Sequence, residues 1–134
     1  MTYKLFLDDY RNPVKHEEWV VARSYSEAVE IIEKQGMPKF ISFDHDLAEQ
    51  HYAGDFSGPE RTGYDFAKWI VDQCLLYGVR LPDGFNFAVH SMNPVGAKNI
   101  RDLMESLLWA IKESGYPTNE EVEINRKYDC GLLS

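Results

Sequence analysis

The feature of this chain that most constrains its fold is the alternation of short strand-like runs with helix-like spacing of apolar residues. The strand-like runs are 3–7, 19–22, 39–43 and 85–89. They consist mainly of β-branched, aromatic and other apolar side chains, as buried strands do. Helical spacing covers 24–35, 64–77 and 94–111. Strands alternating with helices predict right-handed crossovers, and therefore a three-layer α/β domain: a mainly parallel sheet of four to five strands with helices on both faces.

Two of the predicted helices begin with capping signals. Ser24 and Glu27 have the spacing of a capping box, and Asn93 followed by Pro94 is a typical opening for the longest helix. In the first turn of a helix, the backbone N–H groups have no hydrogen-bond partner within the helix. Ser and Asn side chains accept hydrogen bonds from these groups, and proline has no N–H group that needs a partner. The starts of these two helices are therefore predicted to within a residue or two.

The chain becomes polar after its longest helical pattern. Only 122–124 hints at a strand there, so 117–134 is predicted to be a polar C-terminal tail or an edge strand, outside a core of about 3–116. The aromatic residues of the helical patterns, Phe66, Trp69 and Trp109 among them, are predicted to lie in the core.

Length and composition limit the class of protein. A chain of 134 residues fits one domain, 1–134, and its net charge of −8 disfavours binding to the phosphate backbone of duplex nucleic acid. Cys74 and Cys130 form neither a CxxC motif nor a disulfide framework, which favours a reduced, cytoplasmic setting. We find neither a leader-like segment nor an apolar run of about 18 residues, so we expect no membrane partner.

Polar side chains follow three of the four strand-like runs. Asp8 and Asp9 follow the first, Asp44-His45-Asp46 the third, and His90-Ser91 the fourth. The carboxyl ends of parallel strands meet at one edge of the sheet, where α/β domains bind their ligands. The sequence therefore predicts a shared polar site at this edge.

Several carboxylates in one cleft repel one another, and a divalent cation relieves that repulsion. Carboxylate oxygens suit Mg²⁺ or Mn²⁺, and nearby imidazoles shift the preference toward Mn²⁺, Zn²⁺ or Fe²⁺. His45 and His90, with His51 as a further candidate, could instead act as general acid and base. Arg11 could bind a phosphate through two hydrogen bonds, and the helix start at Asn93 offers backbone N–H groups to an anion.

Each of these signals also has an ordinary structural explanation. The Asp8-Asp9 pair could cap a turn, Asp-His-Asp could be a plain loop, and Arg11 could be a solvated charge. Ser91 or Asn93 could simply cap the following helix. Their convergence on one edge of the sheet is what favours a shared site.

Four segments resemble a receiver-like family proposed to process cyclic phosphates. They are 7–13 (LDDYRNP), 42–47 (SFDHDL), 62–65 (TGYD) and 90–100 (HSMNPVGAKNI), and the likeness runs from about 3 to 108. The resemblance implies a flavodoxin-like, receiver-like fold with an acidic, metal-binding pocket. It implies metal ligands at Asp8, Asp9 and Asp44. It further implies the polar positions Arg11, His45, Asp46, His90, Ser91 and Asn93, which we assign to catalysis (His45, His90, Asp46, Arg11) and substrate binding (Arg11, Ser91, Asn93).

The chain departs from this pattern at Ala48, where the family tends to have glycine. It also shows no strand followed by a lysine after the long helix, and signalling receivers need such a lysine to hold an acyl phosphate. The lack of such a lysine in the sequence pattern therefore argues against phosphorelay signalling.

These observations lead to one hypothesis and two alternatives. The leading hypothesis is a metal-dependent phosphoesterase, using Mg²⁺ or Mn²⁺ with Zn²⁺ as an alternative, that hydrolyses a cyclic phosphate on a nucleotide or nucleic-acid end. Its partner is then a small phosphorylated or cyclic-phosphate substrate, and no protein partner can be named. The first alternative is a non-catalytic receiver-like module that binds metal or nucleotide and a protein. The second is an adaptor or inhibitor that has lost the chemistry.

Overall fold

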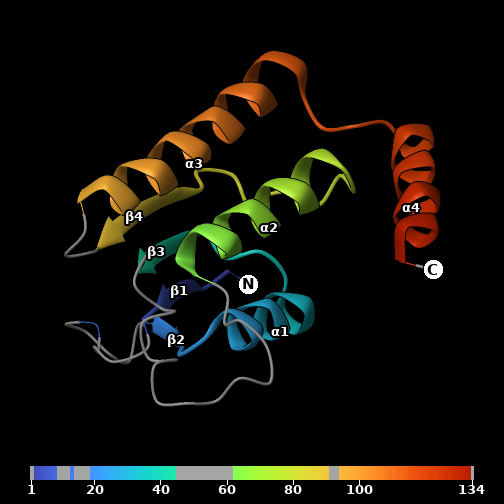
Figure 1. Ribbon diagram of the computed structural model, residues 1–134. Coiled ribbons are helices and arrows are strands. Elements are labelled where there is room, and N and C mark those ends of the chain that lie inside the picture. The colour runs from blue at the N-terminus through green and yellow to red at the C-terminus, as the bar shows by residue number, and fades with distance from the viewer. Residues whose placement is uncertain (1, 9–12, 14–18, 45–61, 91–93, 134) are drawn as a thin grey trace.

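The computed structural model of the chain describes residues 2–8, 13, 19–44, 62–90 and 94–133 (Figure 1). Its sheet has four strands, all parallel, in the order β2-β1-β3-β4. The strands are β1 (Lys4–Leu7), β2 (Trp19–Ala22), β3 (Phe40–Asp44) and β4 (Asn86–His90). The predicted α/β class and parallel sheet are confirmed, and each predicted strand differs from the observed one by at most one residue at either end.

Three helices cover one face of this sheet. They are α1 (Tyr25–Gln35), α2 (Gly63–Leu75) and α3 (Pro94–Ser114), and α2 packs between the other two (Figure 1). The crossovers from β2 to β3 and from β3 to β4 run in the same direction across the sheet, and right-handed crossovers in one direction place their helices on one face. The connection from β1 to β2 runs in the opposite direction, and most of it lies outside the described residues.

The core lies between the sheet and these helices. Leu5 and Leu7 of β1 and Ile41 and Phe43 of β3 are fully buried, because alternate residues of a strand face the same side. On the helices, the buried apolar residues are Ala28, Ile32, Phe66, Ala67, Ile70, Cys74, Ala97, Ile100, Met104 and Leu107. Residues at the intervening strand positions face the other side of the sheet, which is where the candidate site lies.

The predicted helix starts are confirmed. The Ser24 side chain accepts a hydrogen bond from the Glu27 N–H at 3.1 Å, and α3 begins at Pro94. At the start of α2, Thr62 forms a complete capping box with Asp65. In that box Thr62 N–H donates to Asp65 Oδ2 at 2.8 Å, and Asp65 N–H donates to Thr62 Oγ1 at 3.1 Å. These capping residues determine where α1, α2 and α3 begin relative to the strands that precede them.

The prediction for Trp109 is wrong. Phe66 is fully buried and Trp69 packs against the core, but Trp109 is 65% exposed. It lines an open, largely apolar groove between α2 and α3, together with Val71, Leu75 and Leu103. A helix with apolar residues over a wide arc can bury only the part that meets the sheet and its neighbours, and Trp109 falls outside that part.

The prediction of a tail or edge strand at 117–134 is also wrong, because the segment forms helix α4 (Asn119–Leu133). Thr118 and Glu121 make reciprocal hydrogen bonds at its start, with lengths of 3.0 and 3.2 Å. The sequence carries this capping box, and it outweighs the weak strand signal. Figure 1 shows α4 set apart from the sheet, beyond the end of α2, where the Asn125 amide donates to the Leu76 carbonyl at 2.7 Å.

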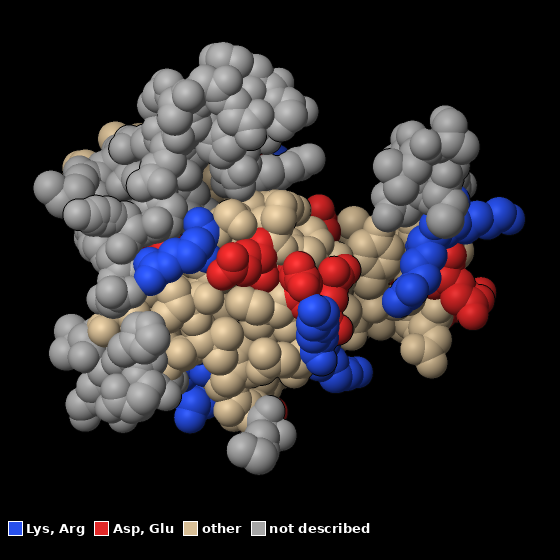
Figure 2. Space-filling model, turned by 90° about the horizontal axis from the view of Figure 1, so that it is seen from below, with Lys and Arg blue, Asp and Glu red and all other residues tan. Residues whose placement is uncertain are grey.

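Charges of both signs occupy the surface. Figure 2 shows Asp and Glu side chains gathered near the middle of one face, with Lys and Arg side chains beside them. Lys34 and Glu30 of α1 form an exposed ion pair, with a hydrogen bond of 2.8 Å. Within the described part of the chain, no helix is both long and apolar enough to cross a membrane.

Candidate functional site

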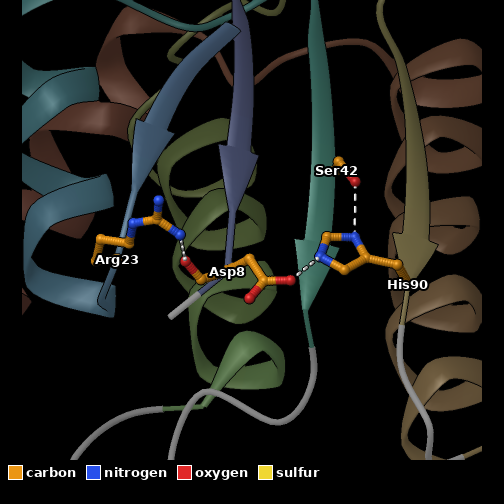
Figure 3. A network of polar contacts seen from close by, with 4 residues as sticks. All are labelled: Asp8, Arg23, Ser42 and His90. Carbon is orange, nitrogen blue, oxygen red and sulfur yellow. Dashed lines mark hydrogen bonds and ion pairs between the residues drawn. The ribbon is translucent and has the colours of Figure 1, made fainter. Parts of the chain in front are cut away.

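Three polar side chains from three strands lie on the face of the sheet opposite to the core. The register pairs Phe6 of β1 with Ser42 of β3, and Asp44 of β3 with His90 of β4. Because side chains alternate along a strand, Asp8, two residues after Phe6, faces the same side as Ser42 and His90. In Figure 3 these side chains lie in front of the strands, with the helices behind.

The His90 side chain reaches across β3 and contacts both other strands (Figure 3). Its Nε2 atom lies 2.9 Å from Asp8 Oδ2, and its Nδ1 atom lies 2.7 Å from Ser42 Oγ. Both distances are those of good hydrogen bonds. Since β3 lies between β1 and β4, a side chain that spans from β4 to Asp8 passes over β3, and this is why Ser42 meets the imidazole.

The network is mostly shielded from water. The Asp8 side chain is 1% exposed and that of His90 is 21% exposed, while Ser42 is 7% exposed. The Phe6 ring stacks on the imidazole, with ring centroids 4.9 Å apart and planes at 11°. Hydrogen bonds are stronger in such a low-dielectric setting, and a buried carboxylate is costly unless it has a partner. Asp8 and His90 therefore hold each other in place.

The protons of this network follow from its donors and acceptors. A carboxylate only accepts hydrogen bonds, so in a pair of an Asp8 carboxylate with His90 the imidazole donates its Nε2–H to Oδ2. A neutral imidazole then accepts at Nδ1 from the Ser42 hydroxyl, and an imidazolium would donate from Nδ1 to Ser42 Oγ. The arrangement can thus take up a proton at Nδ1 and stabilise the resulting cation by the carboxylate of Asp8.

Two residues of this region were missed by sequence reasoning. Ser42 lies inside an otherwise apolar run, and the signal for it is a single polar residue at a position that alternation places away from the core. Arg23 directly follows β2, and its Nη1 atom donates to the Asp8 backbone carbonyl at 3.2 Å (Figure 3). The strand-end rule that selected the aspartates and histidines applies equally to Arg23.

The structure brings together two of the predicted site residues, Asp8 and His90. Asp44 ends β3, and the register places it beside His90. The remaining candidates lie outside the described residues: Asp9, Arg11, His45, Asp46, His51, Ser91 and Asn93. Among the side chains that the structure describes, no group of three or more His, Cys, Asp or Glu is arranged to hold a metal ion.

The chain was compared with known protein families, with curated proteins and with solved structures. A family model described as the cyclic-phosphate processing receiver domain matches residues 3–106. Neither the curated proteins nor the solved structures include a match to the chain. The matched range contains all four strands, helices α1 and α2 and most of α3, together with the Asp8, Ser42 and His90 network.

Proposed function

Because the chain belongs to the family of cyclic-phosphate processing receiver domains, we propose that it is a metal-dependent phosphoesterase that hydrolyses a cyclic phosphate on a nucleotide or nucleic-acid end. The observation that carries this proposal is the hydrogen-bonded network of Asp8, His90 and Ser42 at the carboxyl edge of the sheet.

Opening a cyclic phosphate by water requires two proton transfers. The attacking water loses a proton, and the ester oxygen that leaves phosphorus gains one. A positioned imidazole can take part in both, and such general acid–base catalysis typically contributes about 10²- to 10⁴-fold in rate. His90 has the carboxylate partner that an imidazole needs when it becomes a cation in a shielded site.

The positions of Asp8 and Asp44 along their strands support the proposal of a cation site formed by Asp8, Asp9 and Asp44. Asp8 follows the end of β1 and Asp44 ends the neighbouring β3. Continuing the pairing of Phe6 with Ser42 by two residues places the backbone positions of Asp8 and Asp44 side by side. Carboxylate donors of this kind suit Mg²⁺ or Mn²⁺. When bound, such a cation would polarise the phosphoryl oxygens and lower the pKa of a bound water.

The other predicted residues have roles in the same proposal. His45 and Asp46 would share the acid and base work with His90, and Arg11 would stabilise charge that develops on the phosphate. Ser91 and Asn93 would bind the substrate. These residues lie outside the described residues, so their roles stay predictions.

Hydrolysis of 2′,3′-cyclic and 3′,5′-cyclic nucleotides in the presence of Mg²⁺ or Mn²⁺ tests the proposal. We expect His90→Asn to lower kcat about 100-fold or more, because the amide can hydrogen-bond but cannot carry a proton. Lys98→Ala is the matched control, since Lys98 lies exposed on α3 and pairs with Asp102 at the helix surface. Full activity in His90→Asn would remove this residue from the mechanism.

The metal site has a separate readout. A cation that binds the native state raises the melting temperature by mass action. We expect chelator-treated protein to gain thermal stability on addition of Mg²⁺ or Mn²⁺, and Asp44→Asn to lose that gain. A metal-induced shift without turnover of any cyclic phosphate would favour the alternative of a receiver-like binding module over an enzyme.

A further inference from the structure

The outer edge of β4 is not paired with another strand in the part of the chain that the structure describes. β4 is the last strand on its side of the sheet, at the right of Figure 3. The Asn86 N–H donates to the Lys39 carbonyl at 3.1 Å, so the backbone of Asn86 faces β3. Because the backbone groups of successive residues in a strand point to opposite sides, those of Phe87 and Val89 point away from β3. Their N–H and C=O groups therefore form an open edge.

The core is incomplete at the same edge. The register pairs Phe87 with Ile41 and Val89 with Phe43, so all four side chains face the helices. Ile41 and Phe43 are fully buried, whereas Phe87 and Val89 are only partly buried. Among the described residues, no strand lies beyond β4 to cover them. A further strand beside β4 would bury the exposed parts of both side chains, and this apolar burial would stabilise the pairing.

Little in the sequence of β4 protects its edge. Natural edge strands often carry lysine, another charge or proline, which prevents a second strand from adding. β4 has the sequence NFAVH, without any of these. The Asn86 side chain accepts a hydrogen bond from the Phe87 N–H at 2.8 Å, and a backbone carbonyl can take its place. By contrast, β2, the other outer strand, is preceded by Glu17-Glu18 and followed by Arg23. The edge of β4 is therefore the one that suits a further strand.

We propose that the outer edge of β4 binds the β4 strand of a second copy of this chain, antiparallel and symmetric about Ala88. In this pairing, Phe87 and the partner's Val89 exchange both backbone hydrogen bonds, and Val89 does the same with the partner's Phe87. The two copies of Ala88 face each other as a non-hydrogen-bonded pair. The dimer goes beyond the proposed function and does not depend on it.

The side chains fit an axis at Ala88. This residue is exposed, and its small side chain suits a non-hydrogen-bonded pair, in which the Cα atoms lie about 4.5 Å apart. On the core face, Phe87 lies against the partner's Val89, an aromatic and β-branched pair of the kind that stabilises sheets. The partner's Asn86 lies opposite His90, so the interface extends to the strand that carries the candidate site. An axis at Ala88 also pairs the whole length of β4.

Charge and size set the strength of this dimer. The net charge of −8 on each chain opposes association, but β4 carries no acidic or basic side chain except His90, and more distant exposed charges are screened beyond about 8 Å at physiological salt. The 21 residues of α3 span about 31 Å, and a strand layer and a helix layer are each about 10 Å thick. An interface along this side would cover about 600 Å² per copy, somewhat below the roughly 800 Å² per partner of standard complexes. We therefore expect a weak dimer whose population depends on concentration.

The mass of the full chain in solution tests the proposal. Sedimentation at about 1 to 100 µM spans the dissociation constants of weak dimers. We expect the wild type to approach twice the 15.5 kDa of a single chain. Ala88→Lys places two ammonium groups opposite each other at the axis, so we expect the mass of a single chain at every concentration. Ser26→Lys adds the same charge on the exposed first turn of α1 and is the matched control, which should dimerise like the wild type.

Two outcomes of this experiment would overturn the proposal. One is a wild type that keeps the mass of a single chain over the whole range. The other is a folded Ala88→Lys variant that dimerises as well as the wild type, because the interface would then lie elsewhere. The melting temperature of each variant reports whether it folds.

A cross-link tests the register without a disruptive substitution. In a Cys130→Ser background, Ala88→Cys brings two thiols together at the axis, where the Cα separation of about 4.5 Å lies within the range of disulfides. We expect oxidation to join two chains at least about tenfold faster than in Ser26→Cys, because pairing raises the effective concentration of the thiols. Equal rates in the two variants would refute the pairing about Ala88, even if the wild type is a dimer.

Discussion

At the scale of single residues, the same strand can serve the core and the site because its side chains alternate. In β3, Ile41 and Phe43 are fully buried against the helices, and Ser42 between them faces the imidazole of His90. In β1, Leu5 and Leu7 face the core, and Phe6 stacks on the same imidazole. A shift of either strand by one residue would turn its core side chains toward the site and its site side chains toward the core. Such a shift would therefore disrupt both the packing and the proposed chemistry.

Phe66 and Trp109 both lie in helical patterns that predict a core position, but only Phe66 is buried. We expect Phe66→Ala to lower the free energy of unfolding by about 3–5 kcal/mol, because Phe66 is fully buried and contacts Phe43, with ring centroids 5.8 Å apart. Trp109→Ala should change it by about 0.5 kcal/mol or less, since Trp109 is 65% exposed. Urea denaturation of both variants measures the difference. A loss at Trp109 as large as that at Phe66 would show that its side chain is buried in solution.

At the scale of elements, helix starts depend on short-range hydrogen bonds that can be recognised in the sequence. Ser24 caps α1, Thr62 caps α2, and Thr118 forms a capping box with Glu121 at the start of α4. The α2 cap matters most for the site, because α2 connects β3 to β4, which carry Ser42 and His90.

Removal of the α2 cap should lower the free energy of unfolding without replacing any side chain of the Asp8, Ser42 and His90 network. Thr62→Ala leaves the Asp65 N–H without its side-chain acceptor, and we expect a loss of about 1 kcal/mol in the free energy of unfolding. Thr62→Ser retains the acceptor oxygen and is the control. Equal stability of the alanine and serine variants would mean that the Thr62 hydroxyl contributes nothing to stability in solution.

At the scale of the whole molecule, two groups in the fold resist ionisation in alkali. Burial raises the pKa of Tyr3 and the pKa of Cys74 to about 12 each, from ordinary values of 10.0 and 9.0. Tyr3 joins β1 to the end of α1, since its hydroxyl donates to the Gly36 carbonyl at 2.6 Å. Cys74 lies in the core on α2.

These raised pKa values predict a loss of stability in alkali. In the unfolded chain both groups ionise near their ordinary pKa, whereas in the folded protein they stay neutral up to about pH 12. Their contribution is therefore complete below about pH 9 and declines as the pH rises toward 12. We expect the melting temperature to fall over this range, and to fall less steeply in Cys74→Ala than in the wild type once each curve is referred to its own value at pH 8. Parallel curves for the two proteins would contradict the assigned cause.

Elements that depend on neighbours along the chain can be predicted from the sequence, whereas contacts between distant residues depend on the three-dimensional fold. The strands, the starts of α1 and α3, and the edge position of Asp8 and His90 follow from period, caps and strand ends. The capping box of α4 was also local, although a weak strand signal obscured it. The choice of Ser42 as the partner of Nδ1 and the exposure of Trp109 are different, because they depend on strand order, on register and on which arc of α3 meets its neighbours. No local pattern contains that information, since a side chain's environment is set by residues far away in sequence that only folding brings alongside.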